Sequence, residues 1–333
     1  MTLKQHEPPK LLLQLDALLK RILHHHHRIQ EIESTYNRIL AGFKGELSLD
    51  YYLSSLPEKE FIILHDIRLK IGSYFFQIDT LILHSSFILV IEVKNISGEI
   101  YLDSSFSQMI RTIDGHTEIF PDPILQANKQ MTELKRWLTE NKFSEVPIEH
   151  IVVFTNPKAL IKAPATAPDI NKRLIRNTKL AVKILEYSNV HTKKVLTDKN
   201  LTKLSRKLIK HHVPPNQDVL ELFGLSEHDI QTGIYCKSCN SFSMERVSGR
   251  WRCRFCRQTN KNAHIEALAE YSLLFKPSIT NSEMRKFLNL TSANIAVKLL
   301  SQMNLPATGK TKSKQYLLPP DLVVYKATHL LYK

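Results

Sequence analysis

The sequence contains no run of about 18 consecutive apolar residues, the length that a membrane-spanning helix requires. Met1 to Lys20 also lack the basic start, apolar centre and small-residue cleavage site of a secretory signal. We therefore expect a cytoplasmic protein with no membrane partner. The Gly-x-x-x-x-Gly-Lys-Ser/Thr motif of nucleotide-binding loops is absent too, so ATP-driven movement is not expected from this chain.

Cysteine is scarce, and its four occurrences are confined to one short segment. They form the pattern Cys236-x-x-Cys239, thirteen intervening residues, then Cys253-x-x-Cys256. In a reducing compartment this pattern favours metal binding over disulfides, and its spacing is typical of a zinc ribbon. Four protein ligands leave a zinc ion no open position. We therefore expect a structural Zn²⁺ ion rather than a catalytic one.

Acidic residues are scarce in the second half of the chain. Residues 1–156 contain 16 Lys/Arg and 20 Asp/Glu, whereas residues 157–333 contain 30 and 12. A basic region attracts polyanions, so nucleic acid or an anionic surface is the expected class of partner. Near the cysteines the basic residues alternate with Trp251 and Phe255, a combination that suits phosphate contacts and base stacking. The basic residues near the cysteines are Arg246, Arg250, Arg252, Arg254 and Arg257. As an alternative to base stacking, Trp251 and Phe255 form a small core and these arginines surround it in solvent.

Hydrophobic periodicity predicts an α/β sandwich in the first half of the chain. Residues 10–40 have the spacing of one long helix or two successive helices, with His24 to His27 on its solvated face. A further helical stretch is expected to begin at Gly45. The other predicted elements are strands at 61–69, 74–83 and 87–93 in a meander, strands and turns at 99–119, a helix at 124–141, a buried strand at 148–154, and basic helical segments near 172–187 and 201–211.

The C-terminal region has a different pattern. Two short helices are predicted at 279–288 and 291–303, and a lysine-rich turn at 309–314 then leads into a strand. This order resembles a winged helix-turn-helix, in which the second helix reads DNA, although protein-protein modules have similar patterns. The predicted segments are an N-terminal helical segment (1–40), an α/β core (41–156), a basic helical extension (157–225), the zinc ribbon (230–262) and the winged-helix-like segment (263–333).

The most informative charged residues are Asp79 and, after twelve intervening residues, Glu92-Val93-Lys94. Alternation along a strand places Glu92 and Lys94 on the same face. Both ends of the pattern lie in strongly apolar strands, where charges are costly unless they are paired or bound to metal. A carboxylate pair suits Mg²⁺, which can support phosphodiester hydrolysis, and a neighbouring lysine can orient water and stabilise phosphate charge. An acid two residues before a lysine also occurs on solvated sheet faces.

Further residues complete the pattern of a known family. The chain resembles the nuclease-related domain family, NERD, a branch of the PD-(D/E)XK nuclease superfamily, over about residues 40–155. The elements that carry the resemblance are Gly45-Glu46, Gln77-Ile-Asp79-Thr-Leu-Ile-Leu83, Val90-Ile-Glu92-Val-Lys94-Asn95, Gly98 and Pro123-Ile-Leu-Gln126.

The resemblance implies a restriction-endonuclease-like core with helical additions. It assigns catalytic roles to Glu46, Asp79, Glu92, Lys94 and Gln126. We assign the binding of Mg²⁺ or Mn²⁺ to Asp79, Glu92 and Val93. For Glu46 the alternative is a first-turn helix residue, and for Gln126 a surface position. Asn95, His65, Asp66 and Asp122 are expected to be structural, and the alternative is that they line the same cleft.

The sequence thus predicts a Mg²⁺-dependent nuclease that acts on DNA, with the basic zinc-ribbon and winged-helix segments as its targeting module. RNA as substrate is compatible with the same residues. Two alternatives stay open: a catalytically silent nucleic-acid-binding scaffold, and a DNA-binding regulator in which the C-terminal segments dominate.

Overall fold

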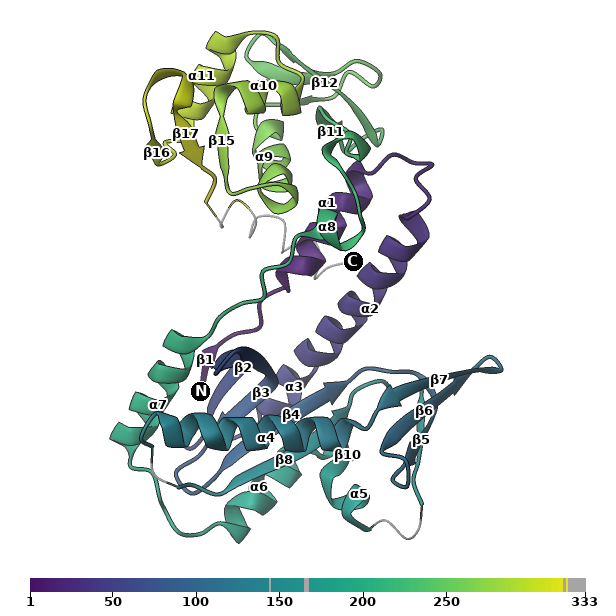
Figure 1. Ribbon diagram of the computed structural model, residues 1–333, viewed down its shortest axis with the longest axis vertical. Helices are drawn as coiled ribbons and strands as arrows, with labels where there is room; N and C mark the ends of the chain where they lie inside the picture. The colour runs from purple at the N-terminus through teal and green to yellow at the C-terminus, as the bar shows by residue number, and fades with distance from the viewer. Residues whose placement is uncertain (144, 165–167, 320–321, 323–333) are drawn as a thin grey trace. The chain divides into compact units, whose positions relative to one another are not determined.

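The computed structural model describes residues 1–143, 145–164, 168–319 and 322 (Figure 1). The chain forms two compact units, each built from two separate stretches of sequence. Unit 1 consists of residues 1–7 and 40–214, and unit 2 of residues 8–39 and 215–333. Within the described ranges, no helix has the length and apolar character needed to cross a membrane.

Unit 1 is built on a six-stranded sheet with the order β1-β2-β3-β4-β8-β10. The predicted meander is confirmed, because β2, β3 and β4 pair antiparallel. The buried strand β8 then pairs in parallel with β4, and both strands contain runs of apolar residues, as expected for strands covered on two faces. The strands are β1 (Thr2–Lys4), β2 (Ile62–Ile71), β3 (Tyr74–Leu83), β4 (Ile88–Lys94), β8 (Ile148–Phe154) and β10 (Leu174–Arg176).

Helices cover both faces of this sheet, as the predicted α/β sandwich requires. Helices α4 (Pro123–Glu140) and α7 (Asp198–His211) pack on one face through residues such as Leu134 and Leu204. Helices α3 (Leu49–Leu53) and α6 (Leu180–Val190) pack on the other through Leu49 and Ile184. Figure 1 shows α4 lying across the strands of the sheet. Ahead of α6, the predicted basic helix is replaced by α5 (Pro168–Arg173), strand β10 and a 3-10 turn, η1 (Asn177–Lys179).

A second sheet of unit 1 has the order β7-β6-β5-β9. The turn-rich stretch 99–119 supplies three of its strands, as predicted. Gly98 begins β5 with a φ of 100°, and a Cβ at this position would lie 2.7 Å from the carbonyl oxygen of Thr112. Only glycine fits such a close approach without strain. The strands are β5 (Gly98–Asp103), β6 (Gln108–Ile113), β7 (His116–Pro121) and β9 (Ala159–Lys162).

The N-terminal helical pattern divides into α1 (Lys10–Arg21) and α2 (Ile29–Leu47). Helix α1 ends because Ile22 adopts an extended conformation, with ψ of 145°, and bridges to Ile230. The prediction that His24 to His27 lie on a helix face is therefore wrong, since these residues form the turn between α1 and α2.

Helix α2 also corrects the predicted helix start at Gly45. The helix continues through Gly42 and Gly45, so Glu46 lies in its last turn rather than in the first turn of another helix. A Cβ on Gly45 would lie 2.5 Å from Cβ of Asn95, which follows β4. The glycine costs helix stability but permits α2 to approach the end of β4 closely, and this approach brings Glu46 to the sheet.

Unit 2 is organised around helix α9 (Ala263–Leu274), against which α1 packs. The side chain of Arg21 is fully buried and donates from Nε to Glu270 Oε2 over 2.6 Å, and Lys20 donates to the other oxygen of Glu270 over 2.7 Å. A buried acid and base satisfy each other here, as charges in a core require. The predicted 1–40 segment is thus shared, because β1 belongs to unit 1 and α1 to unit 2.

Two small sheets complete unit 2. The first contains the cysteines and turns at Ser248-Gly249, where a hairpin was predicted. Its strands are β11 (Ile234–Cys236), β12 (Ser241–Val247), β13 (Arg250–Cys253) and β14 (Thr259–Asn260). The second has the order β15-β17-β16, with strands β15 (Ser278–Thr280), β16 (Ala307–Thr308) and β17 (Gln315–Leu317). Short helical turns occur at α8 (Val219–Leu222), η2 (Glu227–Asp229) and η3 (Thr311–Ser313).

The two predicted C-terminal helices are confirmed as α10 (Asn281–Leu288) and α11 (Ala293–Gln302). Thr280 caps α10 in a capping box with Glu283, and Ser292 caps α11 by accepting from the backbone N–H of Ile295. These caps satisfy backbone donors that a helix start leaves free. The predicted strand after the lysine-rich turn is β17. Residues 320–321 and 323–333 of the predicted 263–333 segment lie outside the described residues.

Candidate active site and cysteine cluster

Asp79 lies at an irregular position of the sheet, where the regular alternation of buried and exposed residues is interrupted on both β2 and β3. On β3, Ile78 and Leu81 contribute to the same hydrophobic cluster, although three positions separate them, and on β2 Leu64 and Ile67 do the same. The interruption on β2 coincides with the positive φ of Asp66, 52°. Regular strands alternate with a period of two, so this shared interruption gives Asp66 and Asp79 space to remain partly exposed amid an apolar sheet.

The carboxylate of Asp79 is fixed by the neighbouring strand. Its Oδ2 accepts a 2.9 Å hydrogen bond from the backbone N–H of Val93. Burial and then the charge of Glu92 raise the pKa of Asp79 well above its usual range, although the Val93 N–H and Lys94 act in the opposite direction. Val93, which was predicted to bind the cation, therefore contacts Asp79, another predicted ligand. Binding of a cation by Val93 itself stays a prediction.

Glu92 and Lys94 point toward helix α4, so the predicted shared face is confirmed. The Nζ of Lys94 donates to Glu92 Oε1 over 2.6 Å and to Gln126 Oε1 over 3.1 Å. The second oxygen of Glu92 accepts a 2.6 Å hydrogen bond from Nε2 of Gln130, which was not predicted as a site residue. Gln126 and Gln130 are four residues apart, so they lie on one face of α4. That spacing was the signal that could have identified Gln130.

Glu46 joins this group from the last turn of α2. Burial and then the charge of Asp79 raise the pKa of Glu46 to about 10, with further contributions from Asp66 and Glu92. The neighbouring negative charges disfavour ionisation of Glu46 and of Asp79, and a bound cation would offset this effect. The site therefore brings together Glu46, Asp79, Glu92, Lys94 and Gln126, and its carboxylates form a donor set that fits a hard divalent cation.

The neighbouring residues that were expected to be structural have local contacts. Asp122 caps α4 by accepting from the backbone N–H of Ile124 over 2.7 Å. Asn95 donates from Nδ2 to the carbonyl oxygen of Ala41 over 2.7 Å and so ties α2 to the end of β4. His65 lies in a group with His6 and Asp50, whereas Asp66 lies beside Glu46 and also beside His6.

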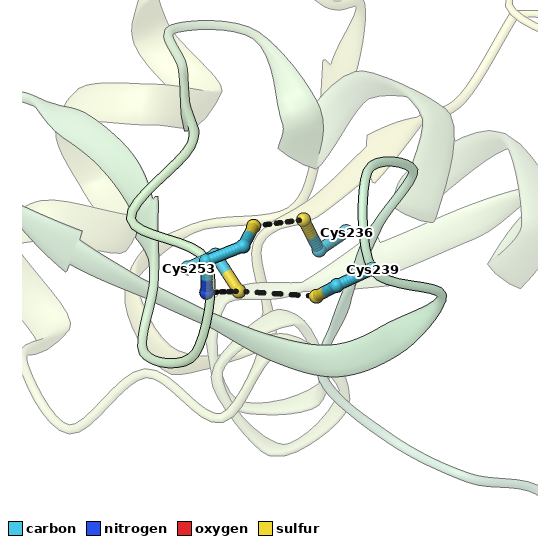
Figure 2. Close-up of side chains that lie close together, drawn as sticks. Cys236, Cys239 and Cys253 are labelled. Carbon is cyan, nitrogen blue, oxygen red and sulfur yellow. Dashed lines mark hydrogen bonds between the residues drawn. The ribbon is translucent and has the colours of Figure 1, made fainter.

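The four cysteines of unit 2 form a second cluster (Figure 2). Their sulfurs lie within 4.8 Å of one another, with 3.5 Å between Cys236 and Cys256 and between Cys239 and Cys253. Four sulfurs about 2.3 Å from one tetrahedral zinc ion would lie about 3.8 Å apart, so the cluster has nearly the size that such an ion requires. The hydroxyl of Ser243 lowers the pKa of Cys253 to about 5 by hydrogen bonding to its sulfur, although burial opposes this effect.

Both Cys-x-x-Cys turns have the same backbone shape at their ends. The residue after each second cysteine has a positive φ, 54° for Asn240 and 62° for Arg257. This conformation is uncommon for residues other than glycine, and its occurrence at equivalent positions indicates two similar turns, each supplying two sulfurs to one centre.

The aromatic residues of this region have different environments. Trp251 is 1% exposed and donates from Nε1 to Nδ1 of His264 over 3.2 Å, so it belongs to the core of unit 2. Base stacking by Trp251, one of the two predicted possibilities, is therefore wrong. Phe255 is exposed, as are Arg250, Arg252 and Arg257, and these side chains remain accessible for a partner.

A comparison with protein families agrees with this geometry. Residues 41–155 match the family model of the nuclease-related domain. The chain contains a NERD domain. This domain includes Glu46, Asp79, Glu92, Lys94 and Gln126, and it relates the chain to nucleases in general. A comparison with curated proteins and another with solved structures each gave no significant match.

Proposed function

We propose that this chain is a Mg²⁺-dependent nuclease that hydrolyses phosphodiester bonds in DNA, with Mn²⁺ as a substitute cation. The observation that carries the proposal is the meeting of three mutually repelling carboxylates, Glu46, Asp79 and Glu92, with Lys94 inside the NERD domain. Active sites are where such strongly shifted pKa values cluster. The meander β2–β4, followed by α4 and the parallel strand β8, supports a core of the PD-(D/E)XK type.

In this proposal each residue has a defined task. Asp79 and Glu92 supply carboxylate oxygens to the cation, beside Val93, whose N–H orients Asp79. A bound Mg²⁺ neutralises charge that develops on the phosphate and activates a water molecule. Lys94 contacts Glu92 and is close enough to the carboxylates to orient that water and stabilise phosphate charge. Gln126 holds the amine of Lys94, and Glu46 offers a further carboxylate that loses its proton when the cation binds.

Unit 2 is proposed to hold the nucleic acid. The four cysteines would bind a structural Zn²⁺ ion, in keeping with the size of their cluster. The order α9, β15, α10, α11, β16 and β17 supports the proposal of a winged helix-turn-helix, in which α11 would enter the major groove and the turn before β17 would form the wing. A cytoplasmic setting fits this assignment, since reducing conditions keep the thiols available for metal.

The decisive experiment incubates the purified protein with supercoiled, linear and single-stranded DNA in Mg²⁺, Mn²⁺ or EDTA. We expect cleavage with either cation and none in EDTA, and a parallel RNA substrate tests the choice of DNA. Binding without cleavage in every cation would contradict the nuclease proposal and favour the scaffold. Tight binding to one duplex sequence, again without cleavage, would favour a regulator.

A further inference from the structure

A second group of potential metal ligands lies in unit 1 next to the nuclease site, and one of its members, His6, also lies near Glu46 and Asp66. It consists of His6, which follows β1, Asp50 of α3, and His65 of β2, with one ligand atom from each within 4.8 Å of the others. The Nε2 of His65 lies 3.3 Å and the Nε2 of His6 lies 3.6 Å from Oδ1 of Asp50. Ligands about 2.0–2.1 Å from one tetrahedral zinc ion lie about 3.3 Å apart, so these separations match such a centre.

The hydrogen bonds of the two imidazoles leave the same nitrogen free on each ring. The Nδ1 of His6 lies 3.3 Å from Oδ2 of Asp66, and because a carboxylate only accepts, this nitrogen carries the hydrogen. The Nδ1 of His65 lies 3.0 Å from the hydroxyl of Thr80. The contact with Asp66 places the hydrogen of His6 on Nδ1, as in metal-binding histidines whose Nε2 has a free lone pair. The Thr80 hydroxyl can accept from Nδ1 of His65 and allows the same tautomer there.

The two Nε2 atoms are buried and have no hydrogen-bond partner. Each histidine side chain is only 1% exposed. A buried nitrogen without a partner costs free energy, so two of them facing one carboxylate oxygen indicate a missing ligand. Asp50, in contrast, is 44% exposed and lines a surface cavity of about 220 Å³, which gives an ion access to the group.

We propose that His6, Asp50 and His65 bind a divalent transition-metal ion of the Zn²⁺ class. Two imidazoles and one carboxylate are ligands that suit such ions better than Mg²⁺. The rings of His6 and His65 are stacked, with centroids 3.7 Å apart and 24° between their planes. Binding therefore requires the His65 ring to turn about χ2, a torsion with a broad energy well, while His6 keeps its contact with Asp66.

The ion would cross-link the segment after β1 to helix α3 and strand β2, which follow it by more than 40 residues. It would also act on the nuclease site through His6, whose other nitrogen faces Asp66 beside Glu46. Fixing the His6 ring would hold the Asp66 carboxylate in place. The site therefore couples the N-terminal strand of unit 1 to the geometry of the acidic cluster.

The test counts zinc ions in the full-length chain. Metal-free protein is reloaded with Zn²⁺ in the presence of excess Mg²⁺, which occupies the carboxylates of the nuclease site, and is then dialysed and analysed for zinc. We expect two zinc ions per chain in the wild type and one in His65→Gln. The double variant Cys236→Ser/Cys253→Ser should also retain one. His116→Gln, which replaces an exposed histidine on β7, is the matched control and should retain two.

Two results would overturn the proposal: one zinc ion in the wild type, or two in His65→Gln. If circular dichroism shows that His65→Gln does not fold, Asp50→Asn replaces it, because Asp50 is half-exposed and the amide has the same shape. Absorption of Co²⁺ added to metal-free Cys236→Ser/Cys253→Ser protein provides a second measurement, because only the proposed site is then complete. A new ligand-field band without a sulfur charge-transfer band supports histidine and carboxylate ligands, and its persistence in Asp50→Asn contradicts them.

Discussion

Gln130 donates a 2.6 Å hydrogen bond to the carboxylate of Glu92, and both side chains are buried. The bond fixes Glu92 Oε2 while Lys94 holds Oε1. Groups that orient a metal ligand typically affect metal affinity about 10–100-fold. We therefore expect Gln130→Ala to raise the Mg²⁺ concentration needed for half-maximal cleavage by about this factor. Mg²⁺ titrations of the cleavage rate measure the change, and Gln108 on β6, a half-buried glutamine that also donates to a carboxylate, that of Asp103, offers a matched control as Gln108→Ala. Equal Mg²⁺ requirements for both variants would show that Gln130 only packs.

Asp79, Glu92 and Lys94 should behave as one catalytic unit. Each alanine substitution is expected to lower the cleavage rate by at least about 100-fold, because each removes a cation ligand or the charge next to it. The effects should not add in double variants, and affinity for DNA should change little. Glu118→Ala on β7 is a control on an exposed carboxylate. Rates near wild type for Asp79→Ala or Glu92→Ala would remove these residues from the mechanism.

Binding of Mg²⁺ should release protons. Since the pKa of Glu46 is about 10 in the folded, cation-free protein and 4.5 in its reference state, the folded state retains the proton between these values, and cation-free stability should fall as pH rises through this window. A cation that binds the carboxylate displaces that proton. Calorimetric titration at pH 8 in two buffers of different ionisation enthalpy counts the protons, and Glu46→Gln should release about one fewer. An unchanged count would place Glu46 outside the cation site.

Removal of zinc should destabilise unit 2 beyond the cysteine hairpins. Cys236, Cys253 and Trp251 share one hydrophobic cluster with residues of α9, α10 and α11, so loss of the metal should loosen these helices as well. Chelation is expected to shift Trp251 fluorescence to longer wavelength while the NERD domain keeps its hydrogen-exchange protection. The variant Cys236→Ser/Cys253→Ser should show the shifted spectrum from the start. Protection that persists through α9 after chelation would contradict a shared core.

The basic residues of the second half of the chain are not confined to the predicted targeting module, so the prediction that this module alone holds DNA needs revision. Residues 157–214 contribute 14 Lys/Arg and only 3 Asp/Glu, and they belong to unit 1. Helix α7, for example, packs on the main sheet through Leu201 and Leu204. Neither unit is therefore acidic as a whole, and both can attract a polyanion.

This revision leads to a test of where DNA is held. Arg250, Arg252 and Arg257 are exposed on unit 2, and replacing all three by alanine removes up to three phosphate contacts. The slope of log affinity against log salt on duplex DNA should then fall by up to about 2.7, at about 0.9 per contact. The matched control removes the same charge from α7 of unit 1, as Lys199→Ala/Lys203→Ala/Arg206→Ala. Equal effects of the two triple variants would contradict a specific role of unit 2.

The sequence predicted the strands of the NERD domain well, because their β-branched runs and turns are local signals. Strand β3 was predicted from Tyr74 to Leu83 and has these bounds. Helix α2 was predicted less well, since Gly42 and Gly45 resemble helix breakers, and the reason for Gly45 is a tertiary contact with Asn95. A contact between segments this far apart in sequence leaves no local signal.

The candidate ligand groups also differ in whether the sequence carries a local signal for them. Asp79, Glu92 and Lys94 were recognisable because they lie on two strands that the sequence predicted. Alternation along the second strand also places Glu92 and Lys94 on the same face. The group of His6, Asp50 and His65 was not, because its members come from three elements and only their side-chain nitrogens and oxygens meet. His65 alone was indistinguishable from a buried structural histidine.

The interleaving of the two units has a consequence for how the protein is made. Helix α1 buries Leu12, Leu15 and Leu18, yet its partner α9 is synthesised about 240 residues later, which takes about 10–50 s at roughly 5–20 residues per second. During that interval the apolar face of α1 is available to chaperones and proteases, whereas most of unit 1 has already emerged. Nascent chains stalled before α9 should therefore be far more sensitive to protease at α1 than at the NERD sheet. A circular permutant that brings α1 next to α9 in sequence should shorten this period of exposure.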